Sequence, residues 1–449
     1  MIHRRILSPL RAPFLSLALA LASAGSLAAP AQPAGAQAEG PRAGTAVAIG
    51  GALKLDNAVV WRRLVQEAGG PGARFAVFAT ASENPERNGA RLVGALNAAG
   101  ARAEFIGVAP RLSGSDAAQA QQLAADPQLA ARVAAMQGVF FSGGAQELIT
   151  ATLAPQGRES ALLAAVRQVL ARGGVVAGTS AGAAIMSEWM FRDAQDALAV
   201  LKGRLRDGME VERGLGFAGP GLFIDQHFLK RGRIARLLPV MVAKGYQLGL
   251  GVEEDSAAFL RDGRVEVLGA RGALFVDLRE AQAGAPGQPF RLRGARLSFL
   301  DRGDQLDLRS LVVTPSREKR EGRAVLPQSP DFKPFFKRAG FFADMLGDNT
   351  LVTAMAQLLD SPDTELRGLA FNGRALLGEP ALAADGGPDP DPTLGFEFRL
   401  YKDARTQGQY TGAWGAEDYS VQDMRLDVIP VRMHRPLYEA LPENEKKER

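Results

Sequence analysis

Cysteine is absent from the sequence, and histidine is scarce. Without cysteine the chain can form no disulfide, no thiolate metal site and no thiolate nucleophile. Its three histidines are His3, His227 and His434. This small number excludes a metal site built from several imidazoles, and it leaves few candidates for a histidine that transfers protons.

The composition is otherwise ordinary for a globular protein. Hydrophobic residues make up 46% and charged residues 23% of the 449 residues, which argues against wholesale disorder and against a protein with many membrane spans. A chain of this length is expected to form two or three domains.

The start of the chain carries a cluster of positive charge. Arg4, Arg5 and Arg11 precede an apolar stretch over 14–21, and small residues follow up to Ala28, which is typical of a cleaved secretory signal. We predict a signal peptide over 1–28, a flexible leader over 29–43 and a secreted or periplasmic protein. The apolar core is too short to span a bilayer, so no stable membrane insertion is expected after cleavage. Removing the three arginines lowers the formal net charge from +4 to about +1, and a nucleic-acid partner is therefore not expected.

From Thr45 onward, short apolar runs alternate with longer segments of helical period. The runs predict strands at 46–49, 75–78, 103–108, 138–141, 175–177 and 222–224, and the segments predict helices at 56–68, 84–99, 117–136 and 147–171. This alternation predicts an α/β fold, with a doubly wound, mostly parallel sheet and helices on both faces. Ligands of such sheets bind beyond the carboxyl ends of the strands, so catalytic residues are expected there.

The pattern changes after about Leu260. Strand-like pieces at 264–268, 273–276, 295–300 and 305–308 are expected to complete the edge of the sheet. A charged stretch near Thr314 predicts a boundary between a main domain over 44–314 and a C-terminal α+β extension over 315–449, which we interpret as an accessory region. We call residues 315–449 the C-terminal region.

The strongest chemical signal is a G-x-S-x-G string with Ser180 at its centre, between a predicted strand and a predicted helix. Such a turn exposes a nucleophilic serine, and the following N–H groups, beginning with Ala181, can stabilise an oxyanion. A second turn over 142–146 supplies Gly144 as a further backbone donor and Gln146 as a side chain that can reach a substrate. Each turn alone is also compatible with simple packing of a helix on a sheet.

A serine nucleophile needs a base, and His227 is the only credible one. His3 leaves with the signal and His434 lies in the C-terminal region. Either Asp225 or one of the acids over 253–255 could orient the imidazole. Three arginines follow within six residues, and guanidinium groups bind carboxylates in a bidentate manner. They are Arg231, Arg233 and Arg236, and they indicate either an acidic substrate or a solvated helix face.

Six motifs together resemble one family. They are AIGGAL, FATAS, FSGGAQ, GTSAGA, DQHFLKRGRIARLL and GLGVEEDSA, and the set is similar to the cyanophycinase branch of the serine peptidases related to aspartyl dipeptidase E, which share a class I glutamine-amidotransferase-like fold. The resemblance spans 44–314, which would then be the catalytic domain. It implies Ser180 as nucleophile, His227 as base and Glu254 as acid. It also implies a substrate pocket lined by Gln146, Asp225, Gln226, Arg231, Arg233 and Arg236. Ala145 stands where the family commonly has an acid or an amide.

The expected function is an exported serine exopeptidase that hydrolyses cyanophycin, a poly-aspartate bearing arginine on each side-chain carboxyl, to β-Asp-Arg dipeptides through an acyl-enzyme. No metal or cofactor is expected, and the partner is cyanophycin or another aspartate-rich peptide. The alternatives are an aspartyl dipeptidase acting on short peptides and a non-catalytic polymer-binding relative. A homodimer is left open. The C-terminal region either packs against the core or holds polymer, and its apolar segments favour packing.

Overall fold

The computed structural model describes residues 43–192, 196–285, 287–380, 382, 386–413 and 418–439. The predicted signal peptide, and the predicted leader up to residue 42, lie outside these residues. None of the helices in the described part is long and apolar enough to cross a membrane. The described residues belong to one compact unit.

Several helices begin directly after a capping side chain. Asn57, Asn84, Asp116, Asp126 and Ser160 each accept a hydrogen bond from a backbone N–H in the first turn of the following helix. The helices of the described residues are α1 (Ala58–Glu67), α2 (Pro85–Ala98), α3 (Ala117–Ala124), α4 (Pro127–Ala134), α5 (Gln146–Leu153), the 3₁₀ turn η1 (Pro155–Gly157), α6 (Ala161–Ala171), α7 (Ala181–Ala184), α8 (Ala197–Leu201), α9 (Ile234–Lys244), α10 (Arg317–Glu321), α11 (Thr350–Leu359) and α12 (Gly373–Leu376).

Two of the predicted helices are each divided in two. The segment 117–136 breaks between α3 and α4, because Asp126 caps α4 directly before Pro127, and proline favours the first turn of a helix over its interior. The segment 147–171 breaks between α5 and α6, where Gly157 takes a φ of +74° and Ser160 caps the second helix. Both segments are helical, as predicted, but the prediction that each forms one continuous helix was wrong.

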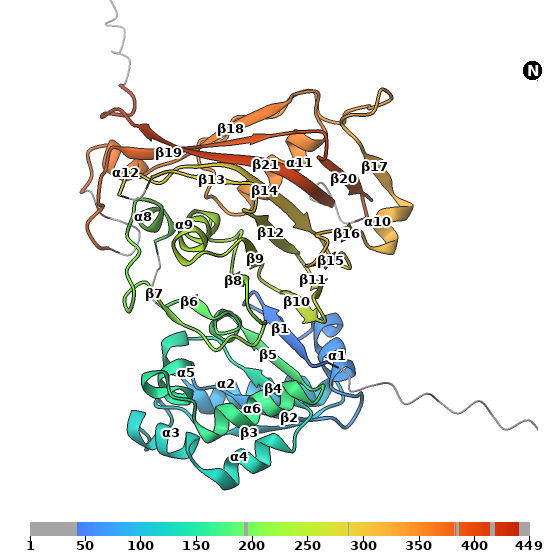
Figure 1. Ribbon diagram of the computed structural model, residues 1–449, viewed down its shortest axis with the longest axis vertical. Coiled ribbons are helices and arrows are strands. Elements are labelled where there is room, and N and C mark those ends of the chain that lie inside the picture. Colours follow the sequence, from blue (N-terminus) through green and yellow to red (C-terminus); the bar gives the residue numbers. More distant parts are fainter. Residues whose placement is uncertain are drawn as a thin grey trace, which may run out of the picture. The chain divides into compact units, whose positions relative to one another are not determined.

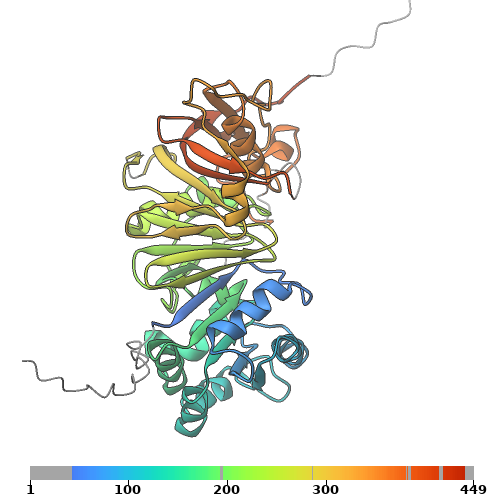
Figure 2. The ribbon, with the colours of Figure 1, turned by 90° about the vertical axis from the view of Figure 1, so that its right-hand side faces the viewer.

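The first sheet has nine strands among the described residues, in the order β16-β15-β11-β10-β1-β5-β4-β2-β3. Five neighbouring strands, in the order β1-β5-β4-β2-β3, pair in parallel. They alternate with helices along the chain, which confirms the predicted α/β fold class. Figure 2 shows helices on both sides of these strands. Val47 and Ile49 of β1 pack in the core with α1 and α2, whereas Ala46 and Ala48 pack in the core with α4, α5 and α6. The strands are β1 (Thr45–Ile49), β2 (Arg74–Phe78), β3 (Arg102–Ile106), β4 (Gly138–Phe141), β5 (Val175–Thr179), β10 (Ser256–Arg261), β11 (Arg264–Gly269), β15 (Gln305–Asp307) and β16 (Val313–Thr314).

A second sheet contains ten strands of the described chain, with the main path β17-β20-β21-β14-β12-β9-β8. It is antiparallel except where β8 pairs with β9. Of the strands expected to complete the first sheet, β11 and β15 do so, but β12 and β14 belong to the second sheet, as does the predicted strand 222–224. The strands are β8 (Leu222–Gln226), β9 (Leu248–Val252), β12 (Ala273–Asp277), β13 (Gln282–Ala283), β14 (Leu292–Leu300), β17 (Arg323–Val325), β18 (Glu365–Ala370), β19 (Leu394–Tyr401), β20 (Gln407–Tyr410) and β21 (Tyr419–Arg432); β6 (Trp189–Phe191) and β7 (Val211–Arg213) form a separate ribbon.

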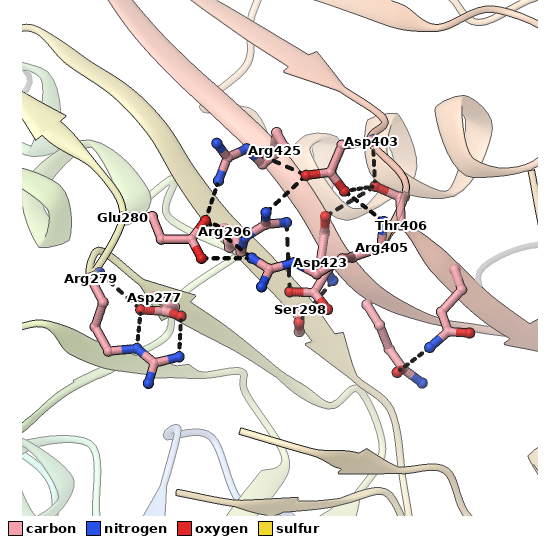
Figure 3. Close-up of polar contacts among 12 residues, drawn as sticks. Asp277, Arg279, Glu280, Arg296, Ser298, Asp403, Arg405, Thr406, Asp423 and Arg425 are labelled. Carbon is pink, nitrogen blue, oxygen red and sulfur yellow. Dashed lines mark hydrogen bonds and ion pairs between the residues drawn. The ribbon is translucent and has the colours of Figure 1, made fainter. Parts of the chain in front are cut away.

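The C-terminal region adds strands directly to the second sheet. The long strand β21, red in Figure 1, pairs with β14, which lies before Thr314, and with β19 and β20. Polar contacts also cross the predicted boundary. Arg296 on β14 forms an ion pair with Asp403 at 2.9 Å, and Ser298 accepts a hydrogen bond from the backbone N–H of Asp423 at 3.1 Å (Figure 3). The division at Thr314 stays a prediction, and the second sheet is built from strands on both sides of it.

Candidate active site

Ser180 lies at the turn between β5 and α7, at the carboxyl end of a strand of the first sheet. Its backbone takes φ 53° and ψ −108°, and its N–H donates to the Ile49 carbonyl at 2.9 Å. The flanking glycines are required by close approach, since a Cβ on Gly178 would lie 2.1 Å from the carbonyl oxygen of Gly182. A strained strand-to-helix turn of this kind presents a serine hydroxyl at the carboxyl end of the strand.

His227 directly follows β8, and its side chain reaches the serine. Its Nε2 lies 2.8 Å from Ser180 Oγ. Its backbone N–H donates to the Gly50 carbonyl at 2.7 Å. Gly51 packs against the imidazole so closely that a Cβ there would lie 2.2 Å from Cε1. The turn after β1 therefore fixes the histidine next to the serine.

The three consecutive acids after β9 point to three different partners. Glu254 Oε1 lies 2.6 Å from His227 Nδ1. Glu253 is 1% exposed and accepts hydrogen bonds from the backbone N–H groups of Leu229 and Lys230, at 2.5 and 3.0 Å. Asp255 turns toward the loop before α1 and accepts from Asn57 Nδ2 at 2.8 Å. Ser180, His227 and Glu254 thus form one hydrogen-bonded chain, the arrangement in which an acid orients a general base.

The electrostatic environment favours a neutral imidazole. Burial is the largest influence and lowers the pKa of His227, the hydrogen bond that the imidazole donates to Glu254 raises it, and the charges of Arg231 and Arg233 lower it further, giving a pKa of about 4. An imidazole with a lowered pKa stays neutral down to a lower pH than one with the ordinary pKa. It can therefore accept the serine proton over a wider range of pH.

This environment leads to a pH prediction. Below the pKa of His227 the imidazole is protonated and cannot accept a proton, so kcat/KM is expected to rise with pH through about 4 and to be level by about pH 6. Initial rates on a soluble substrate, after a stability check at each pH, measure this limb. The exposed His434 provides a control, because His434→Gln should leave the profile unchanged. A limb centred near the ordinary histidine value, about 6.5, would contradict the prediction.

The glycine loop after β4 lies against the serine. A Cβ on Gly143 would lie 3.0 Å from Ser180 Cβ, whereas a Cβ on Gly144 would lie 1.8 Å from the carbonyl oxygen of Ala81. Gly144 has a φ of +137°, so both crowding and backbone conformation require glycine there. The loop is therefore placed beside Ser180, the predicted nucleophile. The oxyanion role of Gly144 and Ala181 stays a prediction.

Gln146 is the first residue of α5, and its side chain is already engaged within the protein. Its Nε2 donates to the carbonyls of Phe191 and Arg192 at 2.8 and 2.9 Å. Ala145, at the N-cap, gives the helix no side-chain hydrogen bond. In this conformation Gln146 ties α5 to the end of β6, and its contact with substrate stays a prediction.

The predicted arginine cluster separates into one exposed and two buried side chains. Arg236 makes two hydrogen bonds to Asp225, at 2.7 and 2.5 Å, and Arg233 donates to the carbonyl and side-chain oxygens of Gln226, at 2.6 and 2.5 Å. These four residues are all at most 5% exposed. They support the loop that carries His227, and the predicted contacts of Asp225, Gln226, Arg233 and Arg236 with substrate stay a prediction. Arg231 alone among the three is exposed.

The structure adds residues that the sequence did not single out. The sequence indicates Glu253 only as an alternative to Glu254, and Gly51 only as part of a motif. Residues 346–349 of the C-terminal region also reach the loop that carries His227, since Asn349 N donates to the Leu229 carbonyl at 3.3 Å. A run of three acids could have indicated more than one role. Nothing in the sequence pattern predicts the contact made by residues 346–349.

Comparison with known proteins identifies relatives of the region that holds this site. The model for peptidase family S51 matches residues 115–268. A cyanophycinase from Synechococcus elongatus is 32% identical over 278 residues, which cover 60% of this chain and 81% of the relative. A cyanophycinase from Trichormus variabilis is 31% identical over 279 residues, covering 60% of this chain and 87% of the relative.

Among solved structures, a peptidase from an acI-B1 Actinobacterium matches with a TM-score of 0.44 and 17% identity, covering 60% of this chain and 98% of that one. A putative peptidase E protein from Listeria monocytogenes EGD-e matches with a TM-score of 0.33 and 14% identity, covering 51% of this chain and 99% of that one.

Proposed function

We propose, from the premise that this chain belongs to the cyanophycinase-like serine peptidases of family S51, that it is an exported exopeptidase releasing β-Asp-Arg dipeptides from cyanophycin. The observation that carries the proposal is the hydrogen-bonded chain of Ser180, His227 and Glu254. All three residues lie within the stretch that matches the family. The relatives named cyanophycinase support cyanophycin as the substrate.

The reaction follows from the roles of these three groups. Ser180 Oγ attacks the backbone carbonyl carbon between two aspartates, and His227 Nε2 accepts the hydroxyl proton. When the tetrahedral intermediate collapses, the C–N bond breaks and His227 gives the proton to the leaving amine. Water then attacks the acyl-enzyme ester, His227 accepts a proton from the water, and the acid product leaves as Ser180 regains its proton. Glu254 holds Nδ1 throughout and stabilises the imidazolium that forms twice in each cycle.

Export is part of the proposal because of the start of the chain. The arginines, apolar stretch and small residues over 1–28 have the order of a secretory signal. An exported enzyme would meet polymer outside the cell that made it, rather than mobilise the cell's own store.

Hydrolysis of cyanophycin by the purified mature chain, residues 29–449, tests the proposal. We expect β-Asp-Arg to accumulate as the product, identified by mass and by comparison with the α-linked isomer. Ser180→Ala protein prepared in parallel is the control for contaminating peptidases and should release none.

Two outcomes would overturn the assignment. Rapid hydrolysis of short α-aspartyl dipeptides without action on the polymer would identify an aspartyl dipeptidase. Polymer binding without hydrolysis, together with no labelling of Ser180 by a serine-reactive phosphonate, would identify a binding protein that retains the fold.

A further inference from the structure

A cavity of about 570 Å³ lies between the catalytic domain and the C-terminal region. Its walls come from α8, from Arg231 and from residues of the C-terminal region between Asp344 and Asp389. This volume lies within the range of about 300–1,000 Å³ that is usual for ligand pockets. The only residue that the cavity shares with the loop after His227 is Arg231.

The cavity adjoins the reaction centre through that loop, residues 227–233, which we call the His227 loop. The backbone N–H of Arg231 donates to the His227 carbonyl at 3.2 Å. The C-terminal region packs directly on the same loop, since a Cβ on Gly232 would lie 2.4 Å from the carbonyl oxygen of Leu346. Lys230 pairs with Asp348. The C-terminal region therefore both lines the cavity and packs on the His227 loop, through neighbouring residues.

Most charged groups around the cavity already have a partner. Lys202 pairs with Asp389 at 2.8 Å, with both side chains nearly fully buried, and Arg374 pairs with Glu379 at 2.6 Å. Asp196 accepts a hydrogen bond from the backbone N–H of Ala199 at the start of α8. These groups can build the cavity, but they are not available to a ligand without losing existing contacts.

Two opposite charges remain. Arg231 and Asp344 are both exposed, both line the cavity, and neither forms an ion pair within the described residues. Within that part of the chain, the side chain of Asp344 accepts only the backbone N–H of Leu346, at 3.0 Å, and its backbone carbonyl accepts the N–H of Gly347 at 3.4 Å. Apolar side chains, among them Leu198, Leu346 and Phe371, complete the lining. A ligand that fits these groups carries a carboxylate, a cation and a flexible methylene chain between them.

We propose that this cavity binds one aspartyl-arginine unit of the polymer beside the unit being cleaved, with Arg231 on a carboxylate and Asp344 on the arginyl guanidinium. The inference rests on the proposed function, because it assigns a binding position to a unit of cyanophycin next to the bond that is cleaved. Each unit of the polymer supplies both charges, whereas a lone aspartyl dipeptide without arginine supplies no guanidinium. The C-terminal region then contributes to the choice of polymer over short peptides.

Full-length Asp344→Asn protein tests this assignment. Losing a charge-assisted hydrogen bond to the guanidinium should raise KM for cyanophycin about tenfold, with kcat nearly unchanged. An activated β-Asp-Arg amide with a small neutral leaving group cannot reach the cavity, so its kcat/KM should stay the same. Asp344→Glu should restore most of the affinity, and Asp331→Asn, another exposed acid of the C-terminal region, should have no effect on either substrate.

The outcomes separate this inference from the function it rests on. If the wild-type chain cleaves cyanophycin but Asp344→Asn leaves its KM unchanged, the cavity assignment is wrong and the function stands. If the wild-type chain does not cleave the polymer, both fail. An equal loss on polymer and on the activated amide would show that Asp344 supports the His227 loop, and this too would overturn the assignment. Thermal melting of each variant identifies any loss caused by unfolding.

Discussion

Ser180→Ala and His227→Ala are each expected to lower kcat by about 10⁴- to 10⁶-fold while leaving the melting temperature nearly unchanged. The two side chains are joined by the 2.8 Å contact between Oγ and Nε2, and neither can perform its part without the other. The double variant should therefore lose little more than either single variant. Single-turnover rates on cyanophycin, with circular dichroism as the test of folding, measure this.

Losses that multiply in the double variant would show that the two residues act independently, and would refute the assignment. Glu254→Gln is the graded comparison. It should cost less than either of the other changes, because Glu254 orients and stabilises the imidazole without transferring the proton. If Asp255→Asn costs more than Glu254→Gln, the acid of the triad has been misidentified. Glu253→Gln should mainly weaken the hold on the backbone of the His227 loop.

Truncation after Thr314 is expected to abolish activity on every substrate and to produce aggregated protein. Removing β21 would leave β14 as an exposed edge strand, which is a template for association between chains. It would also uncover a shared core, in which Leu297 and Phe299 of β14 lie in the same cluster as Leu426 and Val428 of β21. Finally, it would remove the segment around Leu346 that supports the His227 loop.

Size-exclusion chromatography, thermal melting and hydrolysis of a soluble substrate measure the effect, with the full-length chain prepared in parallel. A monomeric fragment that melts cooperatively and cleaves soluble substrate, but no longer sediments with cyanophycin granules, would show the opposite. The C-terminal region would then hold polymer and would not complete the fold.

The sequence predicted most reliably those features that depend on neighbouring residues. The turn at Ser180 could be recognised because its glycines, strand and helix are all adjacent in sequence. His227 was identified by elimination among three histidines. The apolar spacing over 117–136 predicts one continuous helix, but Pro127 begins a second helix there. The proline is a local signal of a helix start, and the prediction gave more weight to the apolar spacing.

Features that depend on distant pairing could not be predicted. The run 222–224 has the pattern of any buried strand, and nothing within it says that β8 joins a second sheet. Arg231 and Arg236 are the same residue type five positions apart, yet one is exposed and the other is buried against Asp225. Their difference depends on how the His227 loop leaves the sheet. The residues alone could not decide which acid orients His227. The acids at 253–255 are consecutive, and the direction in which each side chain points depends on the backbone conformation, which the sequence does not show.

The pairing of β14 with β21 also has a consequence for how the protein is made. More than a hundred residues separate the two strands in sequence, and contacts between distant segments form slowly because a long loop must close first. During synthesis the second sheet lacks its partner strand until almost the whole chain has left the ribosome. The second sheet therefore stays incomplete until late in synthesis, which delays the completion of the fold.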